Sequence, residues 1–171
     1  MAQITLMGKA VQTNSDIPEI GATATDFVLT QNSLKDISLS DLLAKAGKEH
    51  ALLSIVPSLD TDVCATSLKT LEQISGHWPQ TQFLLISADL PFAQQRFCAE
   101  NAIKKVKCLS EMRNKKFAKD YGVHMQDGPM AGLMARAIFI ISHQKIIYQQ
   151  LVTEITEQPD YTAMEAALEK L

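Results

Sequence analysis

Two unbroken apolar runs lie in the middle of the chain. HALLSIVP (50–57) and FLLISAD (83–89) are of strand length and lack polar alternation. Strands that helices cover on both faces have this pattern. Between the runs, residues 64–78 carry leucine and isoleucine at helical spacing, and Pro91 follows the second run at a favoured first-turn position. We therefore predict two central strands, each followed by a helix.

The segments before these runs predict short β elements. Residues 3–13 hold two short alternating runs around Met7-Gly8-Lys9, which is a hairpin signal at the edge of a sheet. Residues 25–31 predict a strand, and residues 36–43 predict a short strand that enters a helix.

The segments after the runs predict a third strand and helix, then a hairpin and a last helix. The predicted elements are a strand at 106–109, a helix at 113–122 ended by Gly122, hairpin strands at 135–142 and 145–152, and a helix at 160–171. Together the elements predict an α/β fold, with helices on both faces of one sheet. The pattern alone does not select one fold of this class.

Composition narrows the class of protein. With 171 residues, 46% of them hydrophobic, and no repeat or Pro/Gly/Ser-rich linker, the chain predicts a single domain over 1–171. The net charge is −3, and the lysine clusters KKVK and RNKK read as solvated faces, so we expect neither nucleic acid nor a membrane surface as partner. No secretion signal or membrane-spanning run is visible, which predicts a cytoplasmic protein.

The chain has three cysteines, Cys64, Cys98 and Cys108. Three are too few for a disulfide scaffold, and an odd number leaves at least one without an intramolecular partner. In a reducing compartment each cysteine is therefore either chemically active or a small apolar side chain. The four histidines have no metal-like spacing with each other or with the cysteines.

Cys64 stands where the helix after the first central strand is predicted to begin. Catalytic groups in open α/β folds collect at this end of the strands. The helix dipole and the unpaired N–H groups of the first turn favour a thiolate there. Thr61 lies three positions earlier on the same face, so its hydroxyl can bond the sulfur or an incoming oxygen, while Pro57 can wall one side of a small pocket.

A structural interpretation of the same residues stays open. Thr61 or Asp62 can cap the helix while Cys64 packs as an apolar side chain, and the spacing does not decide between the two interpretations. Asp60 and Asp62 count against activation, because nearby negative charge disfavours a thiolate.

Activation of Cys64 therefore requires a cation from elsewhere in the chain. Of the three arginines, Arg136 begins an apolar strand, where a guanidinium is costly unless an anion meets it. A thiolate would be such an anion. Residue spacing equally allows a strand-end arginine that reaches water or pairs with an aspartate.

Four separated segments resemble a known family. The stretch PSLDTDVC (57–64) matches the Pro-x-x-x-Thr-x-x-Cys signature of peroxiredoxins. Residues 87–98, 127–141 and 150–161 are similar to the bacterial thiol peroxidase subfamily, the atypical two-cysteine kind. The resemblance covers essentially the whole chain, and it implies a thioredoxin-like fold with an added N-terminal β-hairpin.

The resemblance also implies a role for each site residue. Cys64 would be the peroxidatic cysteine that attacks a hydroperoxide and becomes a sulfenic acid, and Cys98 would resolve it as an intramolecular disulfide. Pro57 would shield Cys64, Thr61 would bind the peroxide, and Arg136 would stabilise the thiolate. Hydrogen peroxide and organic hydroperoxides would be substrates, thioredoxin the reductant and a homodimer the assembly, with no metal or organic cofactor.

Elementary chemistry agrees with a two-cysteine cycle, because a second thiol protects a sulfenic acid from overoxidation. A disulfide requires Cα atoms within about 7 Å. Cys64 and Cys98 lie on successive predicted helices, so we expect one or both helices to unwind locally. Cys108 alternates with Val106 in a short strand and is predicted to be core.

Two other functions fit the sequence less well. A dithiol oxidoreductase would carry Cys-x-x-Cys at the helix start, where this chain has CATS. A redox sensor would need a partner surface that the sequence does not display.

Overall fold

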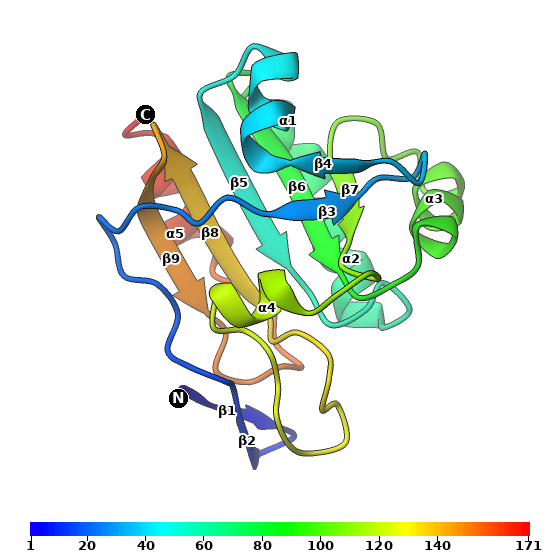
Figure 1. Ribbon diagram of the computed structural model, residues 1–171, viewed down its shortest axis with the longest axis vertical. Coiled ribbons are helices and arrows are strands. Elements are labelled where there is room, and N and C mark those ends of the chain that lie inside the picture. The colour runs from blue at the N-terminus through cyan, green and yellow to red at the C-terminus, as the bar shows by residue number, and fades with distance from the viewer.

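The two apolar runs form the middle of a seven-stranded sheet. In the computed structural model, which describes residues 1–171, β5 (His50–Ile55) and β6 (Thr81–Ser87) pair in parallel. The sheet order is β4-β3-β7-β6-β5-β8-β9 (Figure 1). The other strands are β3 (Val28–Thr30), β4 (Asp36–Ser38), β7 (Lys107–Ser110), β8 (Ala137–Ser142) and β9 (Lys145–Leu151). The prediction of two central strands is confirmed.

Helices cover both faces of this sheet, as predicted. The helices are α1 (Leu39–Ala46), α2 (Asp62–Ser75), α3 (Pro91–Glu100), α4 (Lys116–Asp120) and α5 (Tyr161–Leu168). Helices α1 and α4 lie on one face, and α2 and α5 lie on the other (Figure 1). Side chains alternate along the central strands, so each face has its own hydrophobic cluster. None of the helices is long and apolar enough to cross a membrane.

Helices α2 and α3 differ in how firmly they are held. Helix α2 buries a regular apolar stripe of Leu68, Leu71 and Ile74, and a side chain caps its first turn. Helix α3 buries only Pro91 and Gln94, and its N-cap residue makes no side-chain hydrogen bond. A helix of ten residues with so little buried surface opens at low cost.

The N-terminal hairpin is confirmed, but its predicted place at a sheet edge is wrong. Strands β1 (Gln3–Leu6) and β2 (Lys9–Gln12) form a separate two-stranded sheet. The carboxylate of Glu154, after β9, accepts hydrogen bonds from the Met7 and Gly8 N–H groups at 3.0 and 3.1 Å. The bond from Gly8, followed by those from the Thr5 and Thr156 side chains, lowers the pKa of Glu154 to about 2. The Glu154 side chain therefore holds the hairpin together with two backbone hydrogen bonds, which join Thr5 to Thr153 and Ile155.

The predicted helix at 113–122 is shorter than expected. Helix α4 begins only at Lys116, whose N–H donates to the Asn114 side chain. The guanidinium of Arg113 instead pairs with Asp36 of β4 at 2.8 Å. Arg113 therefore lies before the start of the helix. The predicted stop is correct, because Gly122 has φ +69°, a conformation that favours glycine.

Candidate active site

Strand pairing brings Cys64 and Arg136 to the same end of the sheet. Cys64 lies in the first turn of α2, just beyond the end of β5. Arg136 immediately precedes β8, whose first residue, Ala137, is the antiparallel partner of Ile55 at the end of β5. Residues that are 72 positions apart in sequence therefore meet.

The Arg136 guanidinium contacts the Cys64 sulfur directly. Its Nη2 donates to Cys64 Sγ at 3.1 Å, Nη1 to Ser67 Oγ at 3.2 Å, and Nε to the Ile155 carbonyl oxygen at 3.3 Å. Arg136 is 1% exposed and Cys64 is fully buried. The alternative in which Arg136 reaches water or pairs with an aspartate does not occur. A Cys64 thiolate would compensate the positive charge of this buried guanidinium.

A polar chain behind Arg136 was missed by the sequence analysis. Ser67 Oγ and Tyr161 OH both donate to Gln158 Oε1 at 2.8 Å, and Gln158 Nε2 donates to the Val63 carbonyl at 2.8 Å. Ser67 occupies the position that a second cysteine of a Cys-x-x-Cys pair would fill. The available signals were the i+3 spacing of Ser67 from Cys64, and the presence of Gln158 and Tyr161 in one of the four family-like segments.

Thr61 caps helix α2 and makes no hydrogen bond with the Cys64 sulfur. Its Oγ1 accepts from the Cys64 N–H at 3.4 Å and donates to the Ser58 carbonyl at 3.2 Å. The capping interpretation is therefore correct for Thr61, while Cys64 is both buried and bonded to Arg136. A hydroxyl oxygen has two acceptor lone pairs, so the Thr61 oxygen can accept one more hydrogen bond.

A second missed residue, Asp89, fixes the loop before α2. Its carboxylate accepts from Ser58 Oγ at 2.6 Å, from the Leu59 N–H at 2.7 Å and from Ser87 Oγ at 2.8 Å. These bonds tie the loop that contains Pro57, itself buried, to the end of β6. The only sequence signal was the place of Asp89 in the family-like segment 87–98.

The two acids near Cys64 are solvent-exposed. Asp60 and Asp62 both face water, which screens their charges, whereas Arg136 is buried against the sulfur. The charged group that contacts the sulfur is therefore Arg136 and neither of the two acids.

Cys98 lies against Cys108 rather than against Cys64. All three cysteines are free, and the Cys98 and Cys108 Sγ atoms are 3.3 Å apart. The hydrogen bond with Cys108 lowers the pKa of Cys98. The same bond, together with burial, raises the pKa of Cys108. The predicted core position of Cys108 is confirmed, but its contact with Cys98 was not foreseen.

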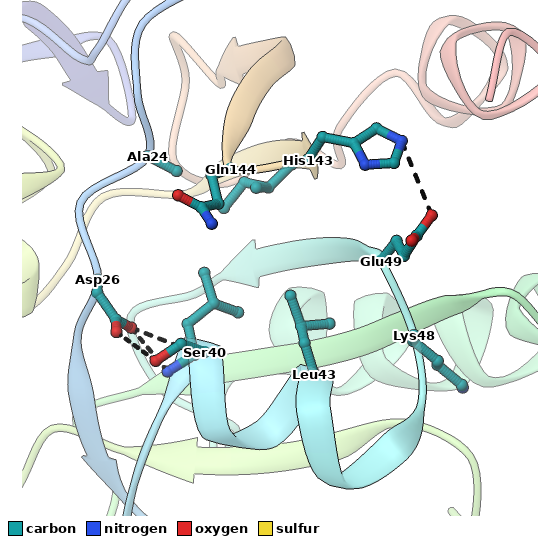
Figure 2. A pocket seen from close by; sticks show the side chains of 10 residues that line it. Ala24, Asp26, Ser40, Leu43, Lys48, Glu49, His143 and Gln144 are labelled. Atoms are coloured by element: carbon teal, nitrogen blue, oxygen red, sulfur yellow. Dashed lines mark hydrogen bonds and ion pairs between the residues drawn. The ribbon is translucent and has the colours of Figure 1, made fainter.

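One cavity of the molecule is lined by none of the three cysteines. Figure 2 shows a cavity of about 370 Å³ near Glu49 and His143, with Asp26 bonded to Ser40 at its margin. Glu49 directly precedes β5, so this cavity lies at the opposite end of β5 from Cys64. It takes no part in the cysteine chemistry.

Comparison with known proteins finds one family model and close relatives that agree with each other. Residues 19–168 match the family model described as Redoxin. Thiol peroxidases of Mycobacterium tuberculosis and Mycobacterium bovis are 44% identical over 169 residues, which is 98% of this chain and 99% of theirs.

Solved structures of similar fold come from the same kind of protein. A peroxiredoxin-like protein from Aquifex aeolicus has TM-score 0.91 and 32% identity, over 99% of this chain and 97% of that one. A thiol peroxidase from Chromobacterium violaceum has TM-score 0.87 and 21% identity, over 98% and 95% of the two chains.

Proposed function

Because this chain belongs to the redoxin family and is a thiol peroxidase with the thioredoxin-like fold of that family, we propose that it reduces hydrogen peroxide and organic hydroperoxides through Cys64. The observation that carries the proposal is the 3.1 Å bond from Arg136 to the Cys64 sulfur. A buried guanidinium at this distance favours the thiolate, which is the nucleophilic form of cysteine.

In the proposed first step, the Cys64 thiolate attacks the terminal oxygen of the hydroperoxide. An S–O bond forms and the O–O bond breaks. The second peroxide oxygen leaves with the bonding electron pair, takes a proton, and departs as water or an alcohol. Cys64 becomes a sulfenic acid. The Arg136 fork stabilises the negative charge that develops on the peroxide oxygens.

Substrate access in this proposal needs a small local movement. The Cys64 side chain is fully buried, so a peroxide reaches the sulfur only when the 57–61 loop or the first turn of α2 moves. The free lone pair of Thr61 then accepts a hydrogen bond from the peroxide hydroxyl and orients it. Pro57 shields the sulfur from water without adding a competing N–H donor.

In the proposed second step, Cys98 attacks the sulfenic sulfur of Cys64, water leaves, and an intramolecular disulfide forms. Cys98 lies seven positions beyond Pro91, about 10 Å along α3 from the helix start, so α3 must open for the bond to form. The small buried surface of α3 supports this opening.

The reductant of the disulfide is also part of the proposal. A dithiol of thioredoxin would reduce the disulfide, and the cycle requires no metal or organic cofactor. A homodimer stays a prediction from the family resemblance, and a cytoplasmic location stays a prediction from the sequence.

Steady-state peroxide consumption tests the function. With thioredoxin, thioredoxin reductase and NADPH, we expect turnover of both hydrogen peroxide and cumene hydroperoxide. Consumption of neither peroxide above the rate without the protein would contradict the proposed function. Turnover with glutaredoxin but not with thioredoxin would contradict only the proposed reductant.

Replacing Cys98 with serine is expected to allow one rapid turnover and then stop the cycle. The first step uses only Cys64, so one equivalent of peroxide should be consumed at the wild-type rate, after which the sulfenic acid lacks its resolving thiol. Rapid-mixing kinetics and labelling of the sulfenic acid with dimedone measure these two stages. Gln95→Ala, an exposed change on the same helix, is the control. Sustained turnover in Cys98→Ser at the wild-type rate would remove Cys98 from the cycle.

A further inference from the structure

Cys98 and Cys108 form a thiol pair in which Cys108 has no role in the cycle described above. Cys98 lies in the last turn of α3 and Cys108 in β7, and their sulfur atoms are 3.3 Å apart. A disulfide is about 2.05 Å long. The two sulfur atoms thus need to approach by little more than 1 Å, between elements that already pack against each other.

A disulfide between Cys64 and Cys98 needs a larger change in the fold. The Cys64 sulfur is buried under α2 against Arg136, and Cys98 is two helical turns from the start of α3. Joining them requires at least one helix to unwind. A Cys98–Cys108 bond leaves both helices in place and is therefore the disulfide that the folded chain favours.

We propose, on the basis of the proposed function, that the disulfide moves from Cys64–Cys98 to Cys98–Cys108. The Cys108 thiol gives up its proton to solvent, and its thiolate attacks Cys98 Sγ. The Cys98–Cys108 bond forms as the Cys64–Cys98 bond breaks, and Cys64 leaves as a thiolate. The exchange is an internal rearrangement with no net oxidation or reduction, so no further reagent is needed.

The environments of the three sulfur atoms favour this direction. A stabilised thiolate is a good leaving group. The Cys64 thiolate that leaves is stabilised by its contact with the buried Arg136 guanidinium. The raised pKa of Cys108 opposes its attack, but the first cause of that shift is the hydrogen bond to Cys98. This cause disappears once the Cys98 sulfur is held in a disulfide, and an open α3 also uncovers Cys108.

The surroundings of the pair give the new disulfide access to a reductant. Cys98 and Cys108 line a cavity of about 320 Å³ together with polar residues that include Gln31, Asn32 and Lys104. Cys64, by contrast, has no exposed surface. The exchange would thus place the oxidised bond where a reductant can attack, and would return Cys64 to its reactive form before reduction takes place.

Disulfide mapping after a single oxidation tests the exchange. The reduced protein is treated with one equivalent of hydrogen peroxide without reductant, quenched in acid, alkylated and cut with trypsin. Trypsin separates all three cysteines, because Lys69, Arg96 and Lys107 lie between or beside them. In the wild type we expect Cys98–Cys108 peptides and alkylated Cys64. In Cys108→Ser we expect Cys64–Cys98 peptides instead.

A second equivalent of peroxide provides an independent readout. The wild type should consume it rapidly, because Cys64 is again a thiolate, whereas Cys108→Ser should consume only the first. Cys64→Ser should form no Cys98–Cys108 bond at the same peroxide dose. Formation of that bond in Cys64→Ser at the wild-type rate would mean direct oxidation of the pair and would overturn the exchange.

The outcomes separate this inference from the function on which it rests. Wild-type protein that holds only the Cys64–Cys98 bond, with Cys108 alkylated, would overturn the exchange and leave the peroxidase cycle intact. Protein in which peroxide leaves all three cysteines alkylated would overturn the proposed function itself.

Discussion

Replacing Cys64 with serine is expected to reduce peroxide turnover to the uncatalysed background. A serine hydroxyl stays protonated at neutral pH and is a poor nucleophile toward an O–O bond. Neither remaining cysteine can take over, because Cys98 and Cys108 contact each other and not the Arg136 guanidinium. Steady-state consumption of hydrogen peroxide with thioredoxin present measures the effect.

A matched control lies on the same helix. Thr66 is exposed and bonds only to the Asp62 carbonyl of its own helix, so Thr66→Ala should keep wild-type turnover. Both variants should show wild-type circular dichroism, since serine is close in size to cysteine. Near-normal turnover in Cys64→Ser would remove the nucleophile from position 64 and with it the proposed mechanism.

Replacing Arg136 with methionine is expected to slow the reaction of Cys64 with peroxide by about 10²- to 10³-fold, the usual effect of removing one donor that stabilises developing negative charge. The dipole of α2 contributes only about 0.3–1 kcal/mol at an exposed helix end, too little to hold a buried thiolate alone. Arg136→Lys keeps the charge but loses the planar fork, so we expect a smaller loss. Rapid-mixing kinetics measure the rate, and the pH dependence of Cys64 alkylation reports its thiolate fraction.

Arg113 provides the control for charge. Its exposed guanidinium pairs with Asp36 on β4 and with the Leu34 carbonyl, not with the sulfur, so Arg113→Met removes one positive charge and should leave the peroxide rate unchanged. Arg136 also bonds to Ser67 and the Ile155 carbonyl, and a thermal melt of each variant separates a folding defect from a chemical one. An unchanged rate together with unchanged alkylation in Arg136→Met would assign Arg136 a structural role only.

The local sequence predicted strands, helix starts and turns correctly where burial and backbone geometry over a few residues determine them. The runs at 50–57 and 83–89 are central strands because nothing polar interrupts them, and Pro91 begins α3 because its fixed φ suits a first turn. The turn at His143-Gln144 has positive φ at both residues, as a two-residue hairpin requires. One placement and one boundary were wrong, since the hairpin forms a sheet of its own and α4 begins at Lys116 and not at Arg113.

The sequence likewise predicts some features of the candidate active site and leaves others open. The sequence by itself determined that a thiol stands in the first turn of a helix behind a buried strand, because strand length, helix spacing and capping are local properties. It left Thr61 between two roles and Arg136 between three, since spacing does not show what a side chain meets across the fold.

Tertiary structure alone decided those contacts. Pairing of β8 with β5 sets Arg136 against Cys64, the packing of α3 on β7 sets Cys98 against Cys108, and Asp89 ties the loop to β6. Each is a contact between residues on different elements, whose distance is fixed by strand register and by the packing of helices on a sheet. Neither quantity is encoded in a local pattern, so the chemistry of the sulfur atoms becomes visible only in the folded chain.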